Sequence, residues 1–128
     1  MQLLLDTHAL LWFLGGNKAL SRPERELIED DDNICLVSKA SLWEMAIKVS
    51  LGKLKLDLPF EEFIGETLVK NKIAILEIES HHLSKLLSLA FLHRDPFDRL
   101  LIAQALSDNL PIVTKDQIFS SYAAEVIW

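Results

Sequence analysis

The chain has 128 residues, half of them apolar, and its formal net charge at pH 7 is −6. This length predicts a single domain with one core over residues 1–128, and no apolar stretch approaches the ~18 residues of a membrane-spanning helix. The negative charge argues against a broad basic surface for nucleic acid, although it leaves room for an enzyme that meets a phosphodiester through bound metal.

Strand-type and helical patterns alternate in the first half of the chain. Residues 2–5 form a short apolar run, and the helical pattern after it ends at Gly15 and Gly16, as helix C-caps do. Ser21 and Pro23 mark the start of another helix, which ends before an acidic turn. The predicted elements are, in order, strand 2–5, helix 8–14, helix 22–28, strand 34–38 and helix 40–51.

The second half begins with residues 53–58, which alternate with period two and predict either an extended arm or a small edge strand. The helix after Pro59 places Phe60, Phe63, Ile64 and Leu68 on one face. The remaining predicted elements are helix 60–71, strand 73–78, helix 81–92 capped by Ser80, helix 97–107, strand 111–114, helix 117–122 and a terminal strand within 125–128.

This alternation of strands and helices predicts an α/β fold, in which helices cover both faces of a central parallel sheet. We therefore expect a three-layer α/β/α arrangement with four to five strands. The single Cys35 lies in a predicted buried strand and fits a reducing compartment. The first residues carry no basic segment before Asp6. Both features favour a cytoplasmic protein over a secreted one.

Four acidic residues stand at corresponding places in this pattern. Asp6 follows the first strand, and Glu44 lies on the first turn of the helix after the second. Asp98 opens the helix at 97–107, and Asp116 lies two residues beyond the apolar run that ends at Thr114. In a parallel sheet such points share the edge beyond the carboxyl ends of the strands, where ligands bind.

Each acid also has a simpler interpretation as a helix cap. Asp95 with Pro96 and Asp98 makes a good helix start, and Ser41 with Glu44 fits the S-x-x-E capping box. Taken singly, capping is the better interpretation of each acid, because acids are routine at helix N-termini. Taken together, their shared edge favours a site.

Carboxylate oxygens are the hard ligands that Mg²⁺ or Mn²⁺ prefers, and such ions promote phosphodiester hydrolysis without a covalent intermediate. Asp95 is a candidate fifth ligand. Arg94 and Arg99 either contact substrate phosphates or pair with the acids beside them. The polar residues expected to orient carboxylates or metal-bound water are Thr7, Ser38, Ser41 and Thr114.

Other residue types add little to the site at this stage. Trp12, Trp43 and Phe97 could be base-stacking platforms, but aromatic residues at helical spacing more often belong to the core. The four histidines show no HExxH spacing and have no cysteine partners, so a zinc site is not expected.

Four motifs together resemble the PIN-domain ribonucleases, and in particular the VapC-like toxins of type II toxin–antitoxin systems. They are LLLDTHALLW, VSxxSLWExAIKxxLGKL, HRDPFDRLLIAQA and IVTKDxxF, and the likeness covers nearly the whole chain. The resemblance implies an endoribonuclease that uses Mg²⁺ or Mn²⁺. It also implies a homodimer and a cognate antitoxin that occupies the cleft. The acidic site that it implies consists of Asp6, Glu44, Asp98 and Asp116.

Two other classes of protein stay open as alternatives. A phosphatase of the haloacid-dehalogenase type also begins with a strand-end Asp, but its nucleophile is normally followed two residues later by another Asp, where this chain has His8. A non-catalytic receiver-like module needs an acidic pair at the first strand end. This chain has Asp6 alone there.

Overall fold

A five-stranded parallel sheet forms the centre of the structure, a computed structural model that describes residues 1–128. The strands lie in the order β3-β2-β1-β4-β5, so β1 is central and pairs with β2 on one side and β4 on the other. The predicted fold class and the terminal strand are confirmed. The strands are β1 (Gln2–Leu5), β2 (Ile34–Ser38), β3 (Ile73–Leu76), β4 (Ile112–Val113) and β5 (Val126–Ile127).

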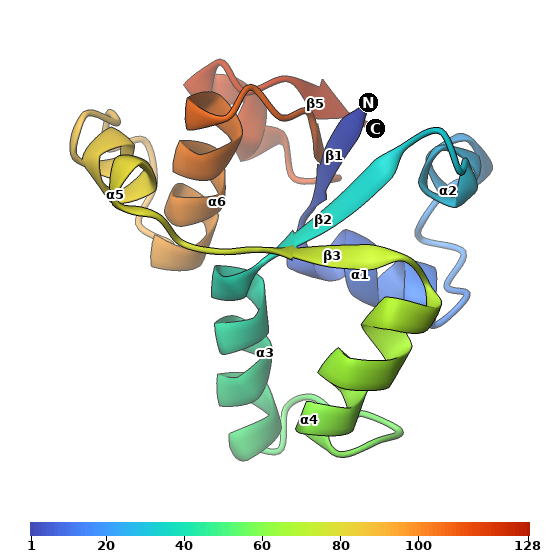
Figure 1. Cartoon of the computed structure of the whole chain (residues 1–128). Coiled ribbons are helices and arrows are strands. Elements are labelled where there is room, and N and C mark those ends of the chain that lie inside the picture. The colour runs from blue at the N-terminus through green and yellow to red at the C-terminus, as the bar shows by residue number, and fades with distance from the viewer.

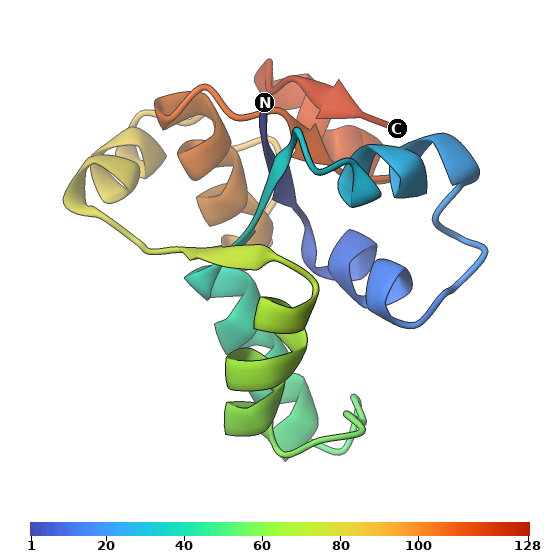
Figure 2. The same ribbon diagram turned by 45° about the vertical axis from the view of Figure 1, so that its right-hand side comes forward.

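Helices cover both faces of this sheet. Figure 1 shows α3 and α4 below β3, and α6 above it on the other side, next to α5. Figure 2 shows α1 and α2 following one another beside β1. The helical elements are α1 (Thr7–Leu14), α2 (Arg22–Glu29), α3 (Lys39–Ser50), α4 (Phe60–Glu62), the π-helical η1 (Phe63–Leu68), α5 (Ser80–Leu87), α6 (Pro96–Ser107) and the 3-10 helix η2 (Gln117–Tyr122).

The alternation of side chains along β1 divides the core into two parts. Leu3 and Leu5 point to one face, where they pack with α1, α2, α3 and η1. Leu4 points to the other face, where it packs with α6 and η2. All three leucines are fully buried. A strand that is apolar on both faces is typical of the middle of a parallel sheet.

Segment 53–58 had two predicted forms, and of these the edge strand does not form; Leu54 and Leu56 pack against the core. Some element boundaries differ from the predictions. Strand β3 ends at Leu76 instead of residue 78. The predicted helix 60–71 widens into π-helical turns, although Phe63 and Leu68 are buried as expected.

Helix α5 differs most from its prediction, in both its start and its end. Its N-cap is Glu79 and not Ser80, because Glu79 and His82 form a reciprocal capping box. It ends at Leu87, whereas the pattern predicted residue 92. The backbone N–H groups of Leu92 and His93 bond instead to the hydroxyl of Tyr122. None of the helices has the length and apolarity that crossing a bilayer requires.

Candidate active site

Three aspartates lie at helix N-termini on the edge beyond the carboxyl ends of the strands. Asp6 caps α1, and its Oδ1 accepts a hydrogen bond of 2.7 Å from the N–H of Ala9. Asp116 caps η2 in the same way, through the N–H of Ile118. Asp95 caps α6. These bonds hold the carboxylates in place and satisfy backbone donors that the helices leave free.

Two threonine hydroxyls tie the acids to one another. Thr114 donates a hydrogen bond of 2.5 Å to Oδ2 of Asp6, and its oxygen accepts a bond from the N–H of Asp116. Thr7 donates a bond of 2.8 Å to Oε1 of Glu44. One set of bonds joins the residues that follow β1 and β4, and the other joins α1 to α3. In both, a threonine orients an acidic side chain, as bonded neighbours do around metal sites.

Glu44 has a different local role from the one that the sequence predicted. Helix α3 is capped by Ser38, whose Oγ accepts from the N–H of Ala40, so Ser41 is not an N-cap and Glu44 belongs to the second turn. The carboxylate of Glu44 points away from the backbone and lies 3.2 Å from Nζ of Lys48. Ser41 is buried, and its hydroxyl has no hydrogen-bond partner.

The four predicted acids line one pocket, which we call the acidic pocket. Its volume is about 230 Å³, and none of its lining residues is hydrophobic. Two of its residues, His8 and Lys48, were not predicted, although both are close in sequence to predicted ones: His8 follows Asp6 by two residues, and Lys48 lies one helical turn after Glu44. The lining residues are Asp6, Thr7, His8, Glu44, Lys48, Asp95, Asp98 and Asp116.

Negative charge inside this pocket is only partly compensated. Burial raises the pKa of Asp98 to about 6, and repulsion from Asp95 and Asp116 contributes, against the opposing effect of His93. Burial likewise raises the pKa of Asp6, although its bonds to Thr114 and Ala9 oppose the shift. Carboxyl groups with raised pKa values, crowded in a cleft, are typical of sites that bind a cation or transfer a proton.

His93 links Asp98 to the other side of α6. The Tyr122 hydroxyl oxygen accepts hydrogen bonds from backbone N–H groups and from Arg99, so its own proton is free to bond to Nδ1 of His93 at 2.8 Å. This network assigns the imidazole proton to Nε2. That nitrogen lies 3.4 Å from Oδ2 of Asp98.

The two arginines near this segment do not join the acidic pocket. Arg99 is buried, and its Nη1 donates to the carbonyl of Ala90 and to the hydroxyl of Tyr122. Its guanidinium also lies 4.0 Å from the ring centroid of Phe91. These contacts make Arg99 a packing residue of α6, in place of either predicted role at the acids. Arg94 is exposed.

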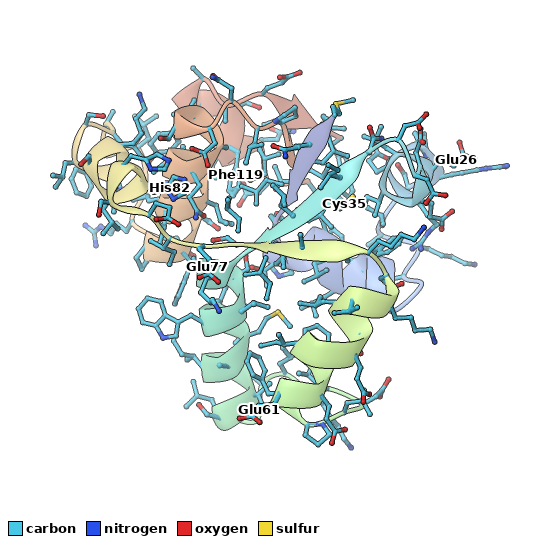
Figure 3. All side chains as sticks on the ribbon, viewed as in Figure 1. Glu26, Cys35, Glu61, Glu77, His82 and Phe119 are labelled. Carbon is cyan, nitrogen blue, oxygen red and sulfur yellow. The ribbon has the colours of Figure 1, made fainter.

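A separate cluster of potential metal ligands lies between α5 and the end of α6. His81, His82 and Asp108 are the one group of at least three such side chains whose ligand atoms all lie within 4.8 Å of one another. Figure 3 shows His82 where α5 faces α6. Nδ1 of His82 accepts from the N–H of Glu79, so Nε2 carries the proton that bonds to Asp108. A metal at Nε2 would displace that proton, and Nδ1 could not take it while it accepts from Glu79. This argues against a metal site there.

No three acids of the acidic pocket place ligand atoms within 4.8 Å of one another, so the pocket is wider than a set of side chains that all bind one ion directly. Its oxygen donors fit Mg²⁺ or Mn²⁺, and an ion held there would keep several water ligands, as Mg²⁺ commonly does in proteins. The candidate ligands are Asp6, Glu44, Asp98 and Asp116, with Asp95 at the rim of the same pocket.

Comparison with known proteins gives one family and several related folds. A family model described as PIN domain matches residues 3–125. No curated protein sequence matches the chain. The structure of VapBC2 from Rickettsia felis, bound to a DNA fragment from its promoter, is similar with a TM-score of 0.75 and 16% identity, over 99% of this chain and 98% of that chain.

Two further solved structures are similar over almost the full length of this chain. VapBC-1 from nontypeable Haemophilus influenzae has a TM-score of 0.70 and 16% identity, with 99% of this chain and 97% of that chain covered. FitAB bound to an IR36 DNA fragment has a TM-score of 0.68 and 14% identity, with 99% and 94% covered. Identities this low show a shared fold and nothing finer.

Proposed function

Because this chain belongs to the PIN-domain family, we propose that it is a metal-dependent endoribonuclease that hydrolyses RNA phosphodiester bonds as the toxin of a toxin–antitoxin pair. The observation that carries the proposal is the acidic pocket, in which Asp6, Glu44, Asp98 and Asp116 meet from four separate segments of the chain. The phosphatase and receiver alternatives gain no support from the family comparison.

The residues of the pocket have distinct roles in this proposal. Oδ1 of Asp6 and Oδ1 of Asp116 accept backbone hydrogen bonds, and Oδ2 of Asp6 accepts one from Thr114, so a metal would bind a remaining lone pair of these carboxylates. Thr114 orients Asp6, and Thr7 orients Glu44. When bound, Mg²⁺ or Mn²⁺ would polarise a phosphoryl oxygen and lower the pKa of a water molecule. Lys48 would balance the charge of Glu44 until substrate enters.

The proposal includes the partners and location of the protein. The similar structures of VapBC2 from Rickettsia felis and of FitAB are both bound to DNA fragments. The likeness to VapBC2 supports a cognate antitoxin as the partner of the present chain. An acidic pocket on a protein of net charge −6 suits an antitoxin segment that carries a basic side chain. We further propose a homodimer that acts in the cytoplasm on RNA.

Purified protein tests this function directly. The purified protein should cleave single-stranded RNA at internal bonds when Mg²⁺ or Mn²⁺ is present. It should not cleave the RNA when EDTA removes the metal. Asp6→Asn should lose cleavage by at least roughly a hundredfold, since one charged ligand of the metal is removed. Asn caps helices as well as Asp does, so the variant should stay folded. Metal-dependent cleavage that persisted undiminished in Asp6→Asn would refute the assignment.

A genetic test addresses the toxin role. Expression of the wild-type chain should arrest growth, and Asp6→Asn should not. Co-expression of a small DNA-binding protein encoded beside this gene should restore growth and copurify with the chain. Growth arrest by the Asp6→Asn variant would show that toxicity has another cause.

A further inference from the structure

A second pocket opens directly beside the acidic pocket. Its volume is about 260 Å³, and it shares Asp6, His8 and Asp116 with the first, so the two are continuous. The two residues that it adds are Trp12 and Lys115. We call it the side pocket. If a phosphate of a bound polymer lies in the acidic pocket, the next monomer along that polymer lies close to Trp12 and Lys115.

An ordered aromatic wall borders the side pocket. His8 and Trp12 lie one turn apart on α1, and their ring centroids are 5.7 Å apart. The indole of Trp128 meets that of Trp12 edge-on, with centroids 5.9 Å apart. Trp12 also packs against the core, yet it remains partly exposed. Helical spacing predicted a core role for Trp12, and the structure adds that its indole lines a pocket.

The charged residues of the side pocket indicate which kind of ligand fits it. Lys115 and His8 are the basic side chains of the side pocket, and Asp6 and Asp116 lie on the side that it shares with the acidic pocket. A fitting ligand thus combines a flat ring for the aromatic wall with a phosphate near a cation. Unpaired nucleotides have this combination, and proteins that bind single strands use aromatic rings beside basic groups.

We propose that the side pocket binds the base of an unpaired nucleotide adjacent to the phosphate that is cleaved, with Trp12 as the stacking residue and Lys115 as a phosphate contact. This inference rests on the proposed ribonuclease function and assigns the side chains that contact the nucleotide next to the cleaved phosphate. In a duplex the bases remain stacked on one another and are not available to a protein ring.

The binding test needs no cleavage. Adenosine or uridine 5′-monophosphate is titrated in Mg²⁺ while the three indole N–H signals are followed by NMR, with assignments from single Trp→Phe variants. We expect the Trp12 signal to move and the Trp43 signal to stay, because Trp43 lies on α3, is 59% exposed and is not part of the pocket. Ribose 5-phosphate, which has no base, should leave Trp12 unmoved. A shift of equal size with ribose 5-phosphate, or none with either nucleotide, overturns the inference.

Kinetics with a single-stranded RNA supply the second measurement. Trp12→Leu should raise KM by roughly five- to a hundredfold, the range expected for one stacked base, with little change in kcat. Trp43→Leu is the matched control and should leave KM unchanged. Trp12→Phe keeps an aromatic ring and should fall between the two. If the wild type cleaves RNA but Trp12→Leu and Trp43→Leu behave alike, the base pocket is wrong and the nuclease function stands.

Nucleotide binding without RNA cleavage would also distinguish the side-pocket inference from the proposed ribonuclease function. If the nucleotides move the Trp12 signal but no RNA is cleaved, the side pocket is supported as a nucleotide site and the endoribonuclease assignment falls. If a basic peptide moves the Trp12 signal and neither nucleotide does, the pocket serves a protein partner, and the inference is refuted.

Discussion

Thr114 donates a hydrogen bond of 2.5 Å to Asp6, a residue 108 positions earlier in the chain. Both residues are buried, and each follows a strand of the same parallel sheet. The bond therefore reports directly that β1 and β4 are neighbours. With the N–H of Ala9 on Oδ1 and the Thr114 hydroxyl on Oδ2, each oxygen of Asp6 accepts one hydrogen bond, and the orientation of the carboxylate is set by both.

Replacing Thr114 with Val tests this arrangement while it keeps the shape of the side chain. The substitution leaves Oδ2 of Asp6 without its donor and the N–H of Asp116 without its acceptor. We expect the free energy of unfolding to fall by about 1–3 kcal/mol. Mn²⁺ affinity, measured by calorimetry, should fall by roughly ten- to a hundredfold. Thr67→Val, outside the acidic pocket, is the control and should not change Mn²⁺ affinity.

The raised pKa of Asp98 predicts how stability depends on pH in the metal-free protein. The folded state binds this proton near pH 6, whereas the unfolded chain binds it only near 3.8. Protonation therefore favours folding, and this contribution to the free energy of unfolding should increase as pH falls from 7 towards 4. The pKa of Asp6 is raised as well and acts in the same direction.

Urea unfolding in EDTA at several pH values checks this prediction. Asp98→Asn should flatten the stability profile between pH 4.5 and 7 and stabilise the metal-free protein at pH 7. The exposed Asp57→Asn is the control and should retain the wild-type slope. An Asp98→Asn profile as steep as that of the wild type would contradict the assignment of the titrating group.

Lys48 is predicted to compete with metal for Glu44. Its Nζ lies 3.2 Å from Oε2 of Glu44, and both side chains are partly exposed. Because solvent weakens such a pair, Lys48→Met should raise Mn²⁺ affinity by only roughly two- to fivefold. RNA affinity should move in the opposite direction, since a cation is lost from the pocket. Lys53→Met, on an exposed loop, is the control and should change neither Mn²⁺ affinity nor RNA affinity. A fall in Mn²⁺ affinity in Lys48→Met would contradict the competition between Lys48 and the metal.

The Tyr122 hydroxyl is predicted to hold the segment before α6 in position. Tyr122→Phe removes the acceptor of backbone N–H groups at Leu92 and His93 and of Nη1 of Arg99. We expect a loss of about 1–3 kcal/mol in unfolding free energy, from donors left without a partner. Hydrogen exchange at Leu92 and His93 should accelerate. Ser121→Ala removes an exposed hydroxyl next to it and should leave both measurements near wild type.

The sequence predicted the sheet and the acidic edge because their signals are local. Short apolar runs such as Leu3–Leu5 are bounded by polar residues; Asp6 follows its run directly, and Asp116 lies two residues beyond another. Capping was right for Asp6, Asp95 and Asp116. It was wrong for Glu44, because α3 begins directly after β2 with Ser38 as its N-cap, three residues before the Ser41 of the S-x-x-E motif.

Contacts between distant residues explain the features that could not be predicted. The apolar run at 86–92 continues a helical pattern, but a hydroxyl thirty positions later binds its last N–H groups and the helix stops early. In sequence, Arg99 directly follows Asp98 and suggested a contact with phosphate or with that acid. Arg99 is instead 5% exposed, because Phe91 and Tyr122 surround its guanidinium. Trp43, expected in the core, packs edge-on against Phe97 and stays largely exposed.

The place of β1 between β2 and β4 has a consequence for synthesis of the protein in the cell. Asp6 leaves the ribosome 110 residues before Asp116, and β4, one of the two strands that pair with β1, also emerges late. Until then a nascent chain lacks Asp116 and the Thr114 hydroxyl that bonds to Asp6, so the proposed nuclease stays inactive while it is being translated. Truncated products that end before β4 should be harmless for the same reason, and they would still present a free strand edge to which a separately made β4 segment could bind.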